Sequence, residues 1–192
     1  MKVLRDKARL KKMSKIDDPF VAISPQKCIA FIWKLTAELW SLRGSPYVER
    51  RLQILLNNKV KFLIVGAYAM GAQGYPRATG DFDIWVESSS ENSKKIYNSL
   101  VKFGAPLEQI NPETFTEKGV IFQVGVAPRR IDILTYIGGV EFNEAYKDKE
   151  EIEVENIKIS FLSKENLIRN KEATGREKDR LDAKYLKNSK NV

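Results

Sequence analysis

The sequence contains no histidine, a single cysteine and no long hydrophobic run. Without histidine the chain lacks the commonest zinc ligand and the usual proton carrier near neutral pH, so any general base is expected to be a carboxylate. The lone Cys28 lies in an apolar segment and is expected to pack in the core. The longest run of apolar residues and glycine, residues 62–72, is shorter than the roughly 20 residues that a membrane helix needs. The basic N-terminus has no apolar block behind it, which argues against a secretory signal and favours a cytoplasmic location.

Two aspartates spaced two apart, Asp81 and Asp83, are the most informative feature of the chain. Before them, the largely apolar residues 61–65 predict a buried strand that ends at Gly66, where the backbone needs conformational freedom. A second strand is predicted over residues 81–86, and because side chains alternate along a strand, both carboxylates point to one face. A backbone separation of roughly 6.5–7 Å lets two carboxylates converge on metal ions held about 3.5–4 Å apart.

A third aspartate, Asp132, lies between isoleucines on another predicted strand, residues 130–135. Three carboxylates on strands form a plausible metal-binding triad, and hard oxygen ligands favour magnesium or manganese over zinc. A lone Asp-x-Asp pair more often caps a turn or lies on a solvated strand face. The glycine turn, the third aspartate, and Arg77 and Thr79 just ahead of the pair together favour a functional site.

Residues 59–86 resemble the nucleotide-binding signature of the polymerase-beta-type nucleotidyltransferase superfamily, in particular its small branches related to abortive-infection and antibiotic-modifying enzymes. The resemblance implies transfer of a nucleoside monophosphate from a nucleoside triphosphate to an acceptor hydroxyl, with release of pyrophosphate. It also implies catalytic and metal-binding roles for Asp81, Asp83 and Asp132, which would hold two magnesium ions or, as an alternative, manganese.

On the phosphate side, the resemblance implies that the turn at Gly66 and Ala67 contacts the triphosphate, through backbone N–H groups at a helix start. The chain departs from the family at two positions, since Ala67 stands where glycine or serine is usual and Gln73 where close relatives often carry histidine. Arg77 is expected either to bind the nucleotide or to pair with a core carboxylate. Thr79 is a further candidate, although organising the turn is the favoured role.

The C-terminal segment carries two further candidates. Ser163 can cap a helix that runs from Lys164 toward Leu186. At 100° per residue in an unbroken helix, Lys171, Lys178 and Asp182 then fall within about 40° of one another on an apolar stripe. The alternative is that Gly175 breaks this helix, which would change each of these angles. The lysines are predicted either to neutralise triphosphate charge, as in similar nucleotidyltransferases, or to extend along the stripe into water. Asp179 is expected on the outer face.

The predicted fold class is α+β, a two-layer arrangement in which helices pack on a mixed β-sheet, with an N-terminal helical extension. The expected parts are a basic flexible tail at 1–18, a helical region at 19–58, a catalytic core at 59–162 and a C-terminal helix at 163–192. Further helices are expected at residues 24–42 and 47–56 and after a cap at Ser90, the last with an apolar stripe that includes Ile96, Tyr97, Leu100 and Val101. Further strands are expected at residues 119–126 and 152–161.

Charge is distributed unevenly along the chain. Of the net charge of +8, residues 1–15 carry +6 and residues 163–192 carry +4, which leaves −2 for the middle. An acidic middle between basic ends suits a polyanionic substrate, either a nucleoside triphosphate alone or a nucleic-acid acceptor as well. For residues 1–15, a solvated tail is favoured over a nucleic-acid arm.

Three function classes remain open. The first is an active nucleotidyltransferase that modifies tRNA, a protein hydroxyl or a small molecule, with the toxin of a toxin–antitoxin pair as one form of it. The second is a catalytically silent nucleotide-binding relative, which the departures at Ala67 and Gln73 suggest. The third is a basic nucleic-acid-binding module whose aspartates are structural.

Overall fold

The structure is a computed structural model that describes residues 24, 26–30, 48–76, 79–126, 129–154 and 156–188. Within these residues, six strands form one mixed sheet in the order β3-β4-β2-β1-β6-β5. The strands are β1 Phe62–Ile64, β2 Asp81–Val86, β3 Ile121–Val126, β4 Arg129–Leu134, β5 Glu150–Val154 and β6 Ile157–Phe161. The α-helices are α2 Val48–Asn57, α3 Gly66–Ala72, α4 Ser90–Phe103, α5 Phe142–Lys147, α6 Lys164–Thr174 and α7 Glu177–Asn188, and Thr114–Thr116 form a short 3₁₀ turn. The predicted α+β class with a mixed sheet is confirmed.

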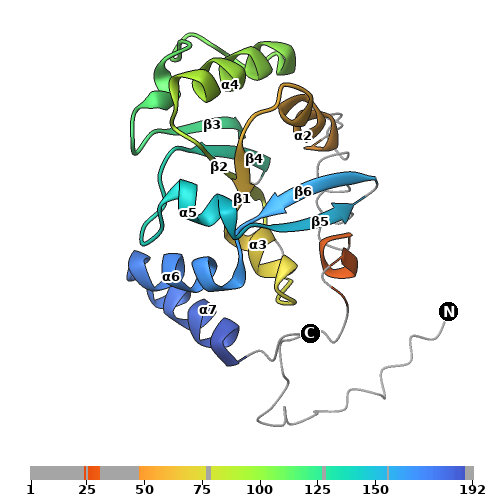
Figure 1. The fold of residues 1–192 in the computed structure, drawn as a ribbon, viewed down its shortest axis with the longest axis vertical. Coiled ribbons are helices and arrows are strands. Elements are labelled where there is room, and N and C mark those ends of the chain that lie inside the picture. Colours follow the sequence, from red (N-terminus) through yellow and green to blue (C-terminus); the bar gives the residue numbers. More distant parts are fainter. Residues whose placement is uncertain are drawn as a thin grey trace, which may run out of the picture.

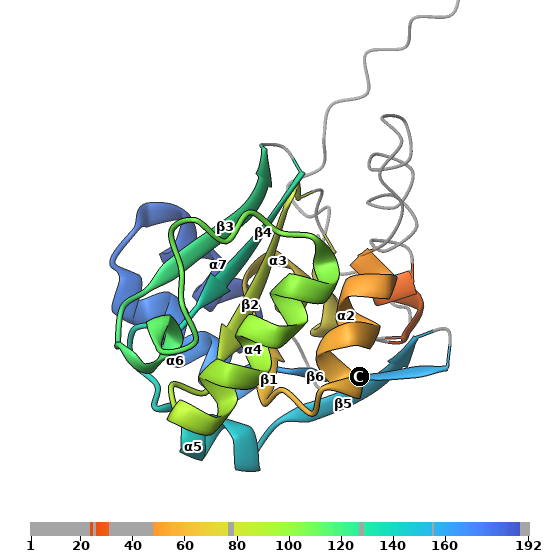
Figure 2. The same cartoon turned by 90° about the horizontal axis from the view of Figure 1, so that it is seen from above.

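Helices cover the sheet on both sides. α2 and α4 lie beside each other on one side, and α6 and α7 lie on the opposite side (Figures 1 and 2). On the second side, the ring of Trp85 from β2 meets the ring of Phe142 from α5 edge-on, with centroids 5.0 Å apart.

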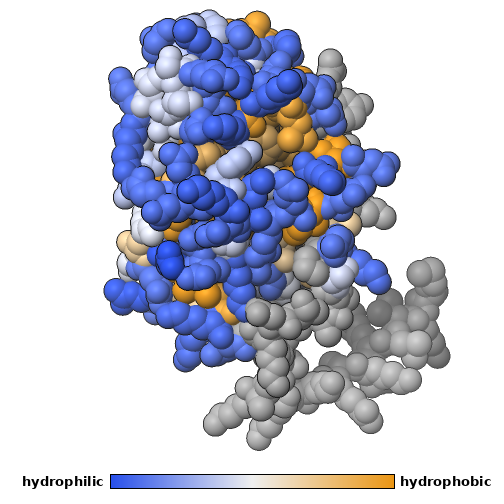
Figure 3. All heavy atoms as spheres, in the orientation of Figure 1, coloured by the Kyte–Doolittle hydropathy of each residue, from blue (hydrophilic) through white to orange (hydrophobic). Residues whose placement is uncertain are grey.

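Polar side chains dominate the surface seen in Figure 3, with hydrophobic residues showing in small patches. Among the described helices, none is both long and apolar enough to cross a bilayer.

Strand β2 lies in the middle of the sheet, where it runs antiparallel to β1 and parallel to β4. Its alternation follows the two-residue period of a strand. Phe82, Ile84 and Val86 are buried on one face, whereas Asp81 and Asp83 on the other are only partly covered. The three residues of β1 are all buried because strands pair on both sides of it and helices cover both faces.

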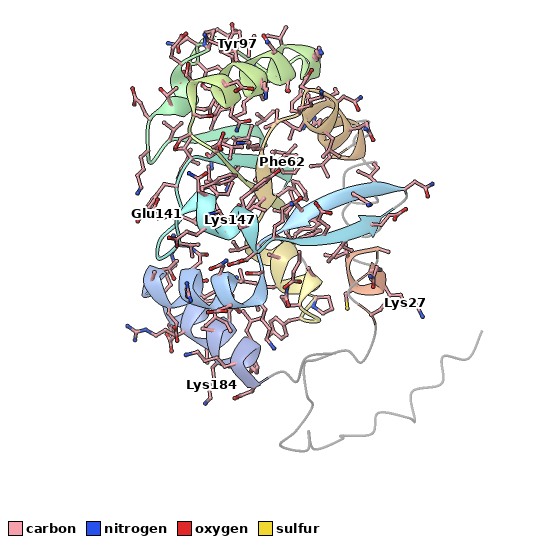
Figure 4. The ribbon with its side chains drawn as sticks, viewed as in Figure 1. Lys27, Phe62, Tyr97, Glu141, Lys147 and Lys184 are labelled. Carbon is pink, nitrogen blue, oxygen red and sulfur yellow. The ribbon has the colours of Figure 1, made fainter. Side chains whose placement is uncertain are left out.

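Several elements differ from the sequence expectations. The expected strand at residues 152–161 is an antiparallel hairpin, β5 and β6, with Asn156 at its turn in a left-handed conformation. The cap of α4 is Ser89 rather than Ser90, because the Ser89 hydroxyl accepts the N–H of Asn92 at 3.3 Å. Of the apolar stripe expected on α4, Ile96 and Leu100 are buried, whereas Tyr97 lies toward the outside (Figure 4) and the side chain of Val101 is half exposed.

Two regions of the N-terminal expectation fall largely outside the described residues. Residues 26–30 are helical, with Cys28 and Ile29 buried, which agrees with the start of the helix expected at 24–42. The remainder of that helix and the basic tail at 1–18 lie outside the described part of the chain.

Candidate active site

The turn after β1 brings the backbone against a carboxylate. Gly66, the first residue of α3, has a φ of 65°, in the left-handed region that favours glycine. A Cβ atom built at this position would lie 2.0 Å from Oδ2 of Asp83. Glycine is therefore favoured at residue 66, because its backbone is left-handed and because a larger residue would force the Asp83 carboxylate to move.

The register of β2 and β4 gathers the three predicted aspartates on one face of the sheet. The Cα atoms of Asp83 and Asp132 are direct partners in this parallel pair, and Asp81 is the partner of Arg130. Neighbouring strands lie about 4.8 Å apart, and residues two apart on a strand about 6.6 Å. Asp81, Asp83 and Asp132 therefore occupy adjacent positions, although Asp132 comes from a segment nearly 50 residues further along the chain.

Asp83 has fewer hydrogen-bonding and ion-pair partners among the described residues than the other two carboxylates. It makes no side-chain hydrogen bond or ion pair with the described residues. The pKa of Asp83 is raised from 3.8 to about 6, mainly by burial and then by the negative charges of Asp132 and Asp81, while the charges of Lys171 and Arg130 act in the opposite direction. A carboxylate in this environment gains from a nearby cation.

Asp132 and Asp81, in contrast, share an arginine. Nε of Arg130 donates to Oδ1 of Asp132 at 2.6 Å, and Nη2 donates to Oδ2 at 3.0 Å. The same Nη2 lies 3.3 Å from Oδ2 of Asp81. The side-chain amide of Gln123 on β3 also donates to Oδ2 of Asp132, at 3.1 Å. Both oxygens of Asp132, which is buried, therefore already accept hydrogen bonds.

The donor set suits a hard divalent cation, although the side chains do not converge on one. Among the described residues, no group of three or more Cys, Asp or Glu side chains is arranged to hold a metal ion. The backbone register, however, does not depend on side-chain rotation, and it keeps Asp81, Asp83 and Asp132 within reach of ions about 3.5–4 Å apart. The carboxylate oxygens are ligands that Mg²⁺ and Mn²⁺ prefer.

The C-terminal candidates lie in a broken helix. The chain turns at Gly175, which has a φ of 69° in the left-handed region, so α6 and α7 replace the single helix expected from Lys164. Lys171 is buried between the two helices, and its Nζ lies 2.6 Å from Oδ1 of Asp179 and 3.1 Å from Oδ2 of Asp182. Lys178 is exposed on α7 and does not join them.

Asp179 is part of this buried cluster, so its expected position on an outer face is wrong. Its Oδ2 also accepts the hydroxyl of Thr174 at 2.7 Å. Although burial raises the pKa of Asp179, the hydrogen bonds from Lys171 and Thr174 outweigh burial and hold that pKa below its ordinary value. Lys171 thus donates a hydrogen bond to Asp179 and forms ion pairs with both carboxylates of α7.

The remaining candidates occupy the turns around the aspartates. The hydroxyl of Thr79 donates to the backbone oxygen of Asp81 at 3.1 Å and accepts the N–H of the same residue at 3.3 Å, so Thr79 organises the entry into β2. Ala67 follows Gly66 in the first turn of α3. Arg77 lies outside the described residues.

Gln73, one of the two departures from the family pattern, has a structural partner. It is the C-cap residue of α3, and its side-chain amide donates to Oε2 of Glu150 at 2.7 Å. Oε1 of Glu150 in turn accepts the backbone N–H of Lys164 at the start of α6, at 3.1 Å. One carboxylate on β5 therefore connects the end of α3 with the beginning of α6.

The sequence interpretation missed Arg130 and Gln123 as neighbours of Asp132. For Arg130 a signal existed, because it stands two residues before Asp132 on the same strand and therefore on the same face. For Gln123 there was none, since its contact depends on the register of β3 against β4, where it is the Cα partner of Asp132.

Comparison with known proteins gives a likeness to solved structures at the level of the fold only. No family model matches the chain, and no curated protein does. A solved structure of a presumed nucleotidyltransferase from Thermotoga maritima is similar to it, with 22% sequence identity over 74% of this chain and 91% of that chain and a TM-score of 0.48. This likeness concerns the course of the backbone only, and the chemistry of the site rests on its own residues.

Proposed function

We propose that the chain is a metal-dependent nucleotidyltransferase, which transfers a nucleoside monophosphate from a nucleoside triphosphate to an acceptor hydroxyl. The observation that carries this proposal is the register of β2 and β4, in which Asp83 lies directly beside Asp132 with Asp81 two residues away on the same face. The close approach of Gly66 to the Asp83 carboxylate supports it, because the turn after β1 then borders the same carboxylates. The raised pKa of Asp83 indicates that this carboxylate gains from a cation.

In the proposed reaction the three carboxylates have separate tasks. Asp81, Asp83 and Asp132 would hold the metal ions, and Asp132 would also help to take up the proton of the acceptor hydroxyl. Bound Mg²⁺ or Mn²⁺ supplies positive charge that offsets the charge of the triphosphate. The acceptor oxygen forms a bond to the alpha phosphorus while the bond from that phosphorus to the bridging oxygen breaks. Pyrophosphate leaves with the electron pair.

On the phosphate side, the backbone N–H groups of Gly66 and Ala67 are the proposed ligands of the triphosphate, because the first N–H groups of a helix lack partners within it. Lys171 is close enough for its charge to lower the pKa of Asp83. The nucleotide-binding roles of Arg77 and Lys178 stay predictions.

Nucleotide binding tests the proposal directly. Isothermal titration with each of the four nucleoside triphosphates, with and without Mg²⁺, should show metal-dependent binding to the wild type and none to the Asp81→Ala, Asp83→Ala double variant. Asp148→Ala, which removes an exposed carboxylate just after α5, is the matched control and should bind normally. Failure of all four triphosphates to bind the folded wild type in the presence of Mg²⁺ or Mn²⁺ would remove the proposal.

A nucleotide-binding protein without transfer activity is the second candidate. The observation that favours it is that Arg130 bonds both oxygens of Asp132, the residue to which the proposal gives the acceptor proton. Release of pyrophosphate from a bound triphosphate in the presence of acceptor separates the two candidates. Binding without release would favour the silent relative.

The acceptor is the most open part of the proposal. The basic ends of the chain, +6 over residues 1–15 and +4 over residues 163–192, favour a polyanion such as tRNA as the first acceptor to test, before a protein or a small molecule. Label transfer from α-labelled triphosphate to total tRNA, compared between wild type and the double aspartate variant, gives this test. Growth arrest on expression of the wild type but not of the double variant would support the role of a toxin.

A further inference from the structure

Arg130 belongs to the aspartate face by backbone register, whatever rotamer it adopts. It stands two residues before Asp132 on β4, and its Cα atom is the direct partner of Asp81 on β2. Because side chains alternate along a strand, Arg130 and the three aspartates point to the same face of the sheet. Arg130 therefore places a permanently charged guanidinium group beside the three carboxylates.

The guanidinium engages the oxygens that a metal ion would use. It donates to both oxygens of Asp132, at 2.6 and 3.0 Å, and lies 3.3 Å from Asp81. An arginine that meets a carboxylate with two N–H groups makes one of the stronger hydrogen-bonded pairs in proteins, and its charge is fixed at any ordinary pH. A divalent cation at these oxygens would meet a positive group within a few ångströms, in a partly dry environment where charge repulsion is large.

We infer that Arg130 competes with divalent cations for Asp132 and Asp81, so that the guanidinium sets the metal affinity of the site. The inference rests on the proposed function, since it concerns the metal ions that the reaction needs. Asp83, which makes no ion pair with the described residues, remains the ligand open to a cation, whereas Asp132 becomes one only when Arg130 turns away. The site is thus expected to bind free divalent cations weakly.

Metal binding in the absence of nucleotide tests this competition without any measurement of activity. Mn²⁺ titration of the full chain, followed by the loss of the electron paramagnetic resonance signal of free Mn²⁺, should give a dissociation constant for wild type and for Arg130→Gln. Because a hydrogen bond to a charged group is lost with the guanidinium, Arg130→Gln should bind Mn²⁺ at least about tenfold more tightly. Arg130→Lys, which keeps the charge but loses the two-pronged contact, should fall between them.

Two controls separate competition from a general charge effect. Lys184→Gln removes one positive charge from the outer side of α7 (Figure 4) and should leave Mn²⁺ binding unchanged. In an Asp132→Asn background, Arg130→Gln should have a much smaller effect than in wild type, because the shared ligand is gone. Circular dichroism and thermal unfolding confirm that each variant is folded, and Arg130→Lys provides the comparison if Arg130→Gln does not fold.

The outcomes distinguish this inference from the proposed function. If wild type binds Mn²⁺ in an Asp83-dependent manner and folded Arg130→Gln binds no more tightly, the competition is refuted while the nucleotidyltransferase proposal stands. If neither wild type nor any Arg130 variant binds Mn²⁺, with or without nucleoside triphosphate, both are refuted. If Arg130→Gln binds Mn²⁺ more tightly than wild type, and if adding Asp83→Asn to this variant abolishes the binding, both the competition and the proposed function are supported.

Discussion

Replacing Asp83 by asparagine should stabilise the fold at neutral pH, although Asp83 is the centre of the candidate site. Burial and the neighbouring aspartates raise the pKa of Asp83 from 3.8 to about 6, so the folded state binds this proton more tightly than the unfolded state. Between pH 3.8 and about pH 6 the folded chain binds more protons than the unfolded chain, so the free energy of unfolding falls as the pH rises. Above about pH 6 Asp83 is charged in both states, and the full destabilisation by its buried charge is present.

The magnitude follows from the shift. A pKa change of about 2 units corresponds to about 3 kcal/mol at 1.36 kcal/mol per unit, and partial exposure of the side chain makes this an upper bound. Asp83→Asn keeps the size of the side chain and removes the charge. We therefore expect it to raise the free energy of unfolding by about 1–3 kcal/mol at pH 7.5, with the difference shrinking toward zero near pH 4.

Urea unfolding followed by circular dichroism, in buffer with a chelator, measures this difference at several pH values. Asp132→Asn is the matched control and should behave oppositely, because it loses charge-assisted hydrogen bonds with Arg130 and leaves that guanidinium without its main partner. An Asp83→Asn variant that is less stable than wild type at pH 7.5, or a difference that does not depend on pH, would refute the electrostatic reasoning.

Two further substitutions test other parts of the site. Gly66→Ala should lower the free energy of unfolding by about 1–3 kcal/mol, because the left-handed backbone and the Asp83 oxygen, 2.0 Å from the position of the new Cβ atom, both oppose the substitution. It should also weaken triphosphate binding. Thermal unfolding measures the first effect and isothermal titration the second. Lys171→Met should cost about 3 kcal/mol or more in urea unfolding, because it leaves Asp179 and Asp182 buried with their cation removed. Lys178→Met, on the exposed side of α7, should change stability by less than about 0.5 kcal/mol, and an equal loss in both lysine variants would contradict the buried pairing.

The parts of the site that follow from local periodicity could be predicted from the sequence. The strand at Asp81 and Asp83, the common direction of these two carboxylates and the break at Gly66 all follow from the period of a strand and from the conformational freedom of glycine. The roles assigned to these residues stay predictions.

Long-range register could not be predicted in the same way. That Asp132 lies beside Asp83 depends on β4 pairing in parallel with β2, a choice that no local pattern specifies. The C-terminal prediction failed for a related reason. The helical angles used for Lys178 assume an unbroken helix, and the turn at Gly175 resets the phase, so that Asp179 rather than Lys178 joins Lys171.

Glu150 has a mechanical consequence. Its two oxygens accept the Gln73 side chain at the end of α3 and the Lys164 N–H at the start of α6. Helices α3 and α6 are therefore both hydrogen-bonded to one residue of β5, the strand at the edge of the sheet. Through these two hydrogen bonds, a displacement of α3 would be transmitted to the first turn of α6.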